Sequence, residues 1–240
     1  MAVMALILNL ETASTNCSVS LAGDGKLLAL REENSVQYSH SGQLHLFIEA
    51  VLRDAGESLE NLDAVAVSRG PGSYTGLRIG VSAAKGLCYA LGIPLISLST
   101  LRGMALQLQP GAGVLIPVLD ARRMEVYAAV FSYDHAQIRE TRAEIISPES
   151  FMEFAAKGSV CILGSGAAKC RDVLHHPNMV FKEDIYPSAR EMAMASFESF
   201  REGKFEDTAY FEPHYLKDFM AGGKSGSTSA AAQKSNNAPS

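Results

Sequence analysis

The feature that most restricts the fold is a unit of strand, carboxylate, polar turn and strand that occurs twice. In the first copy, the apolar segment 4–10 leads to Glu11, a polar turn and a second strand. In the second copy, the apolar segment 114–119 leads to Asp120 and another polar turn. Short apolar runs that end in turn residues are typical of buried strands. The recurrence predicts a duplicated α/β unit, and therefore two lobes built alike.

Between the two units the apolar period changes from that of strands to that of helices. Over 41–55 apolar residues recur at intervals of three and four positions, which predicts an amphipathic helix. A second helix is expected over 77–91, after the glycine-rich loop 69–76. We expect a first lobe over 1–108 and a second over 109–220, whose last helices can pack back on the first lobe. The segment 221–240 has no periodicity, and we expect a disordered tail there.

Composition limits the classes of function. A chain of 240 residues, 47% of them hydrophobic, can bury one large core or two smaller ones. The net charge of −5 argues against a protein that grips RNA mainly through its phosphates, so we expect contact with nucleic acid only through a partner. The 4 cysteines lack metal-site spacing and are expected to be core thiols. Without a signal peptide or a membrane span, a cytoplasmic location is expected.

The glycine-rich loop has two interpretations. A loop between a strand and a helix can direct backbone N–H groups at an anion, with Gly70, Gly72 and Ser73 as candidate phosphate contacts. It is not a Walker A loop, because the Gly-Lys-Ser/Thr ending is missing, and it is not the G-x-G-x-x-G dinucleotide fingerprint, because Thr75 stands where the third glycine would be. The alternative is a purely structural turn.

The carboxylates at the strand ends have two interpretations as well. Glu11, with the neighbouring Thr12, and Asp120 could face one cleft and hold a nucleotide with Mg²⁺, as in nucleotide-dependent kinases and hydrolases. Alternatively, each carboxylate caps its own turn.

Small residues share one face of the second helix, at a spacing of one or two helical turns. They are Gly76, Gly80 and Ala83 or Ala84, and Leu87 continues the same face. Glycine inside a soluble helix costs roughly 0.5–1 kcal/mol relative to alanine, so close approach of another element should offset that cost. The approach could come from within the subunit or from a partner. In the second case, Gly80→Leu or Ala84→Arg should abolish pairing and leave the fold intact.

These segments resemble the TsaB family, formerly called YeaZ. The resemblance is carried by GPGSYTGLRIGVSAAKGL at 70–87, by GIPLISLSTL at 92–101 and by PVLDARRMEVY at 117–127. It extends over about 6–216, with Glu11 where the family more often has aspartate. The resemblance implies an actin-like ASKHA fold, with two RNase H-like lobes that each contain a mixed sheet flanked by helices.

The resemblance also implies partners. TsaB-like proteins pair with TsaD, the paralogue that forms N6-threonylcarbamoyladenosine at position 37 of tRNAs reading ANN codons, and the ATPase TsaE joins the pair. Homodimers through the same surface are known in the family. Pairing uses helices of the first lobe, so the candidate interface residues are Leu44, Phe47, Ile48, Gly76, Arg78, Gly80, Ala83, Ala84 and Leu87.

We expect a partner subunit and not the enzyme. TsaD-like proteins carry a His-x-x-x-His metal pair where this chain has Thr100 and Met104, neither of which can replace an imidazole as a ligand. No catalytic residue, metal or resident cofactor is therefore expected, although weak nucleotide binding with Mg²⁺ stays open. The alternatives are an actin-like nucleotide-dependent hydrolase or kinase, and a homodimeric interaction protein with a role related to proteolysis. The latter reflects the older grouping of the family with M22-type glycoproteases.

Overall fold

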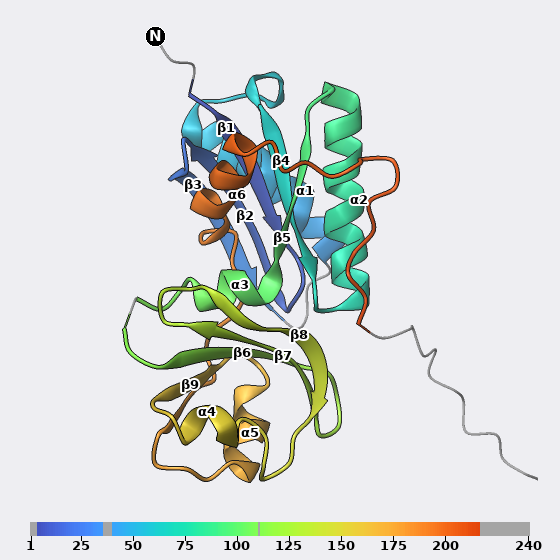
Figure 1. Ribbon diagram of the computed structural model, residues 1–240. Coiled ribbons are helices and arrows are strands. Elements are labelled where there is room, and N and C mark those ends of the chain that lie inside the picture. Colours follow the sequence, from blue (N-terminus) through green and yellow to red (C-terminus); the bar gives the residue numbers. More distant parts are fainter. Residues whose placement is uncertain (1–3, 36–39, 110, 217–240) are drawn as a thin grey trace, which may run out of the picture.

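The computed structural model describes residues 4–35, 40–109 and 111–216, so the predicted tail 221–240 lies outside the described residues. Two lobes, each built on a five-stranded mixed sheet, lie one above the other (Figure 1). This arrangement confirms the predicted α/β class and the two RNase H-like lobes of an actin-like ASKHA fold.

The first lobe contains the predicted strand hairpins and both predicted helices. Its elements are β1 (Leu6–Glu11), β2 (Asn16–Gly23), β3 (Lys26–Asn34), α1 (His40–Ala55), a short 3₁₀ helix (Leu59–Asn61), β4 (Ala64–Gly70), α2 (Tyr74–Leu91), β5 (Leu95–Ser99) and α3 (Thr100–Ala105). α2 begins earlier than the predicted residue 77, because the Ser73 side chain caps it by accepting the Gly76 N–H at 3.2 Å.

The second lobe repeats this plan with shorter helices. Its elements are β6 (Val114–Asp120), β7 (Glu125–Ser132), β8 (Gln137–Ile145), α4 (Met152–Ala155), β9 (Val160–Leu163), α5 (Ala167–Val173) and β10 (Met179–Lys182). The last helix, α6 (Met192–Arg201), returns to the first lobe and packs on its sheet.

The two sheets have the same topology. The first has the order β3-β2-β1-β4-β5, and the second, counted from its opposite edge, has the order β8-β7-β6-β9-β10. In both, the opening strand pairs antiparallel with the second strand and parallel with the fourth. The duplication predicted from the strand–carboxylate pattern is therefore present in the strand order.

Alternation along β1 separates the two faces of the first sheet. Leu6, Leu8 and Leu10 face the core beneath α1 and α2, whereas Ile7 belongs to the cluster beneath α6. Because side chains alternate along a strand, Asn9 and Glu11 share the α6 side with Ile7. The face of the sheet beneath α6 thus carries buried polar groups next to apolar ones.

α3 joins the two lobes. Leu101, Met104 and Ala105 of this short helix lie in one buried cluster with residues of β6, β7 and β9 of the second lobe. The predicted division between residues 108 and 109 lies in the segment between α3 and β6.

The segment after α6 forms a strap that crosses the first lobe and descends beside α2 (Figure 1). Glu206 bridges to Leu95 of β5, Lys85 of α2 donates to the carbonyls of Ala209 and Phe211 at 3.1 and 3.0 Å, and the His214 N–H donates to the Arg69 carbonyl at 2.7 Å. The strap thereby covers one flank of α2.

All four cysteines are free and buried, as the sequence predicts. Burial raises the pKa of Cys17 to about 11 and that of Cys170 to about 12. In the described part of the chain, no helix is long and apolar enough to cross a membrane.

Candidate functional site

The glycine face of α2 packs against the turn between β1 and β2. A Cβ atom at Gly76 would lie 2.1 Å from the Thr12 carbonyl oxygen, and one at Gly80 would lie 2.3 Å from Thr12 Oγ1. A Cβ atom at Gly72 would lie 2.3 Å from the Ala13 carbonyl oxygen. Thr12 Oγ1 donates to the Gly76 carbonyl at 2.8 Å, which ties the turn to the helix. The glycines are therefore explained by contacts within the subunit.

This packing corrects part of the predicted partner interface. Several of the predicted contacts are buried inside the chain, namely Leu44, Ile48, Gly76, Gly80 and Ala84. The helical period identified the apolar side of each helix correctly, but that side faces its own sheet. The prediction for Gly80→Leu and Ala84→Arg is corrected too, because the leucine would strike Thr12 and the arginine would place a charge in the core.

The other predicted interface residues lie at or near the surface. Phe47, Ala83 and Leu87 are half-buried at the margin of the core. Arg78 is exposed, but its guanidinium lies 4.3 Å from the centre of the Tyr74 ring and its Nε donates to the Tyr215 hydroxyl at 3.3 Å. Arg78 therefore already holds the strap against α2.

A second series of small residues on α2 remains open to solvent. Ser82, Gly86 and Ala90 follow one another at intervals of four, and each is exposed. A Cβ atom at Gly86 would meet no atom of residues 4–35, 40–109 or 111–216 within 4 Å, so no contact among these residues explains this glycine. On the same face of the sheet, α1 exposes Leu46, whose relative accessibility is 62%. The spacing of 82, 86 and 90 could have revealed this surface in the sequence, but the series beginning at Gly76 obscured it.

The phosphate-loop candidates are engaged internally. The Ser73 N–H donates to the Ala13 carbonyl at 2.7 Å, and the Gly76 and Leu77 N–H groups donate to Ser73 oxygens. Gly70 has a φ of +107°, a backbone conformation that favours glycine. These N–H groups would have to leave their present partners before they could hold an anion at this loop.

Glu11 is buried and caps the turn that follows it. Its Oε1 accepts the Ala13 N–H at 2.6 Å and the Ser68 hydroxyl at 2.8 Å. Burial raises the pKa of Glu11 from 4.5 to about 7, although these hydrogen bonds oppose the shift. Glu11 and Ser68 line a cavity of about 10 Å³ beside Arg102 and Glu191, which is room for about one water molecule.

The raised pKa of Glu11 predicts a pH-dependent stability. Below pH 4.5 the Glu11 carboxyl is protonated in the folded and the unfolded protein, whereas above pH 7 folding must bury a charged carboxylate. The stability that Glu11 contributes to the fold is therefore lost as pH rises through about 7. Glu11→Gln keeps an acceptor for Ala13 and Ser68 without the charge. We expect it to raise the free energy of unfolding by about 2 kcal/mol at pH 8 and little at pH 4.5, measured by urea denaturation. Glu198→Gln, an exposed change on α6, serves as control, and parallel curves for wild type and Glu11→Gln across pH would refute the assignment.

Asp120 makes the corresponding turn in the second lobe. Its Oδ1 accepts the N–H of Arg122 at 2.6 Å, two positions on, as Glu11 accepts that of Ala13. Lys169 lies 2.8 Å from the same oxygen. The structure thus shows both strand-end carboxylates capping their own turns, and neither pocket found in the described residues is lined by both.

The two residues that stand in place of the metal-binding histidines of TsaD-like proteins are buried. Thr100 and Met104 have relative accessibilities of 1% and 0%. Met104 belongs to the cluster that joins the lobes, and its methyl carbon approaches Gly164 of the second lobe. Among the described residues no group of three or more His, Cys, Asp or Glu side chains is placed to hold a metal ion.

Comparison with known proteins gives consistent matches. The family model described as TsaD, tRNA N6-adenosine threonylcarbamoyltransferase, matches residues 34–225. The chain is 33% identical over 224 residues to the tRNA threonylcarbamoyladenosine biosynthesis protein TsaB of Escherichia coli, covering 90% of this chain and 96% of that protein. It is 30% identical over 134 residues to the TsaB protein of Bacillus subtilis, covering 56% of this chain and 58% of that one. The structure of YeaZ from Pseudomonas aeruginosa matches with a TM-score of 0.75 and 26% identity, over 89% of this chain and 100% of that chain.

Proposed function

Because this chain belongs to the TsaB (YeaZ) family of tRNA threonylcarbamoyladenosine biosynthesis proteins, we propose that it is the non-catalytic subunit that binds and activates TsaD. The chain takes part in tRNA modification. In the proposed division of labour, TsaD transfers the threonylcarbamoyl group to adenosine 37 of tRNAs reading ANN codons, and this chain holds TsaD in its active conformation.

One observation carries the proposal, namely the open series of small residues on α2. A glycine inside an exposed helix costs roughly 0.5–1 kcal/mol unless close packing uses it. No described residue packs against Gly86 in this way, since a Cβ atom there would meet none of their atoms within 4 Å. A helix of TsaD lying across Ser82, Gly86 and Ala90 would approach the backbone of α2 closely and would use this glycine. Leu46 of α1 offers an apolar contact on the same face of the sheet.

The predicted nucleotide and metal positions support the non-catalytic role. Glu11 and Asp120 cap turns, and Thr100 and Met104 are buried where TsaD-like proteins place metal-binding histidines. A nucleotide-dependent reaction would require the glycine-loop N–H groups and these carboxylates to exchange their present partners. We therefore propose that the subunit needs no cofactor of its own.

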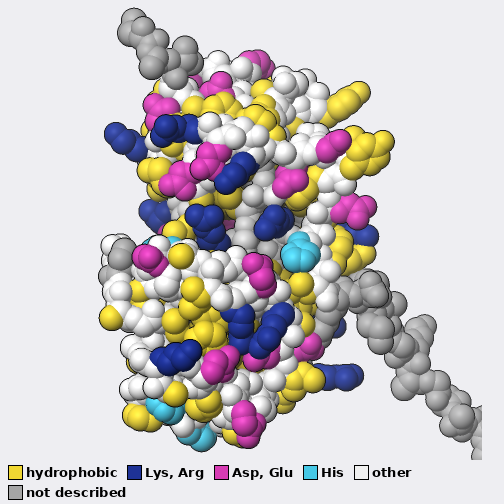
Figure 2. All heavy atoms as spheres, in the orientation of Figure 1, with side chains coloured by type: hydrophobic (Ala, Val, Ile, Leu, Met, Phe, Trp, Pro, Cys, Tyr) yellow, Lys and Arg dark blue, Asp and Glu magenta, His cyan; other side chains and the backbone are white. Residues whose placement is uncertain are grey.

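The remaining partners follow from the same role. We propose that TsaE joins the pair, that tRNA is held only through the complex, and that a homodimer can form through the α2 face when TsaD is absent. In the face seen in Figure 2, lysine and arginine side chains are interspersed with aspartate and glutamate. With a net charge of −5, this mixture favours indirect contact with tRNA.

The proposal is tested by mixing the purified chain with TsaD of the same organism and measuring mass by size-exclusion chromatography with light scattering. We expect a complex that contains both chains. A homodimer that persists unchanged when TsaD is added in excess would contradict the proposal.

A further inference from the structure

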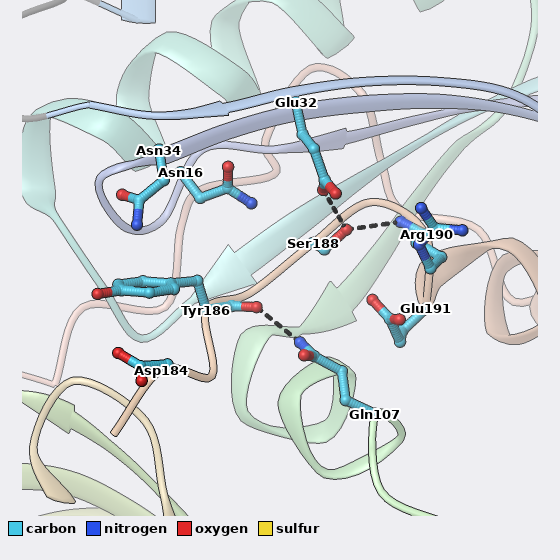
Figure 3. Close-up of a pocket in the computed structure, with 9 residues that line it drawn as sticks. All are labelled: Asn16, Glu32, Asn34, Gln107, Asp184, Tyr186, Ser188, Arg190 and Glu191. Carbon is cyan, nitrogen blue, oxygen red and sulfur yellow. Dashed lines mark hydrogen bonds between the residues drawn. The ribbon is translucent and has the colours of Figure 1, made fainter. Parts of the chain in front are cut away.

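A pocket of about 290 Å³ opens between the first lobe and the segment that returns to it from the second lobe (Figure 3). Asn16, Glu32 and Asn34 line it from β2 and β3, and Gln107 lines it from the residues after α3. The remaining wall comes from the returning segment, through Asp184, Tyr186, Ser188, Arg190 and Glu191. The volume is near the lower end of small-molecule pockets, roughly 300 Å³.

The charge of this pocket is not balanced. Glu32, Asp184 and Glu191 contribute three carboxylates and Arg190 one cation, which leaves two negative charges. Among the described residues, none of these carboxylates has a lysine, arginine or histidine nitrogen within 4.0 Å. Carboxylates that share a pocket are stabilised by an opposite charge between them. The missing component is therefore a cation.

Unused hydrogen-bond acceptors point into the same space. Glu191 Oε2 is buried without a hydrogen-bond partner in the described residues, and Figure 3 shows this carboxylate turned toward the pocket from the start of α6. Asn16 is 5% exposed and lines the pocket; its Nδ2 donates to the Pro187 carbonyl at 2.9 Å, whereas its Oδ1 accepts no hydrogen bond from a described residue. Buried acceptors are rarely left unpaired in native proteins, so Glu191 Oε2 requires a donor.

The lining favours an organic cation over a metal ion. No group of three or more metal-binding side chains is assembled in the described part of the chain, the acidic side chains of this pocket included. The ring of Tyr186 and the amides of Asn16, Asn34 and Gln107 line the same pocket as the carboxylates (Figure 3). An aromatic face and dispersed acceptors suit ammonium groups joined by an alkyl chain.

We propose that this pocket binds a small aliphatic diamine, with one ammonium group at Glu191 and Glu32 and the other toward Asp184. Two positive charges match the two excess negative charges, and the alkyl chain lies along Tyr186. Because the pocket is built from both the first lobe and the returning segment, a bound diamine would tie the return of the chain to β2 and β3. This site is separate from the α2 face proposed to bind TsaD.

Titration calorimetry at fixed ionic strength tests the proposal with 1,4-diaminobutane as ligand. We expect saturable binding to one site, at least about tenfold weaker binding of 1-aminobutane, and no binding of 1,4-butanediol. Glu191→Gln should weaken diamine binding about tenfold and the more exposed Asp184→Asn about threefold. Glu198→Gln removes an equal charge elsewhere on α6 and should change nothing.

Three results would overturn the proposal. They are the absence of a saturable heat, equal weakening by Glu198→Gln, and binding of 1-aminobutane as tight as that of the diamine. The last result would mean that the pocket accepts a single ammonium group, such as a lysine side chain. Asp184 is exposed, so its variant should fold normally even if Glu191→Gln does not. Loss of TsaD binding would leave these outcomes unaffected, which separates this proposal from the proposed function.

Discussion

Gly76→Ala is expected to lower the free energy of unfolding by about 3 kcal/mol, although alanine is the better helix former. The added Cβ atom would lie 2.1 Å from the Thr12 carbonyl oxygen. That oxygen belongs to the backbone of the turn between β1 and β2. The neighbouring Glu11 accepts two hydrogen bonds that hold this turn in place, so a shift of the turn away from the added atom would cost free energy. Relief of the clash would also stretch the 2.8 Å hydrogen bond from Thr12 to the Gly76 carbonyl. The free energy of unfolding is measured by urea denaturation, with circular dichroism as the signal.

The matched control is Gly86→Ala, the same change in the same helix. In the part of the chain that the structure describes, nothing lies within 4 Å of a Cβ atom at Gly86, so helix propensity alone should act and raise the free energy of unfolding by roughly 0.5–1 kcal/mol. The two variants are therefore expected to shift stability in opposite directions. Shifts of the same sign would mean that the β1–β2 turn does not restrain α2 as the structure indicates.

Gly86→Leu is expected to weaken TsaD binding about a hundredfold or more and to leave the fold intact. A leucine at this position projects into open space within the chain, but it would hold a partner helix away from the α2 backbone. Changes at the centre of a packed interface can cost about 2 kcal/mol or more, and a hundredfold loss of affinity corresponds to about 2.8 kcal/mol. Binding is measured by calorimetry with purified TsaD, and folding by circular dichroism and thermal denaturation.

Gly158→Leu controls for the size of the new side chain. Gly158 also has no described atom within 4 Å of its Cβ position, but it lies in the second lobe, after α4. This variant should bind TsaD like the wild type. If Gly86→Leu binds TsaD normally while Gly158→Leu does not, the interface lies on the second lobe and the α2 assignment is wrong.

Much of the fold could be predicted from local patterns. The helix expected over 41–55 is α1 (His40–Ala55), and the strand hairpins at the start of each lobe appear where apolar alternation and turn residues indicated. One helix start was less accurate. The helix expected over 77–91 is α2, which begins at Tyr74 because the Ser73 side chain caps it.

The functional surfaces were harder to predict, for a physical reason. Helical periodicity shows which residues share a face, but it does not show what covers that face. Gly76 is in contact with Thr12, which lies 64 positions earlier in the sequence. A pattern of neighbouring residues cannot show a contact between positions so far apart. The pocket of about 290 Å³ brings Asn16 of β2 close to Glu191 at the start of α6. Periodicity cannot predict that the chain returns from the second lobe to the first at this point. The strand-end carboxylates were more tractable, since each accepts an N–H only two positions away.

The most direct test of the central claim is a reconstituted modification reaction. TsaD, TsaE, the threonylcarbamoyl adenylate and an unmodified tRNA reading ANN codons are combined with and without this chain, and N6-threonylcarbamoyladenosine is quantified by mass spectrometry. We predict that modification requires the chain, that Gly158→Leu restores it and that Gly86→Leu does not. Full modification in the absence of the chain would contradict its role as the activating subunit.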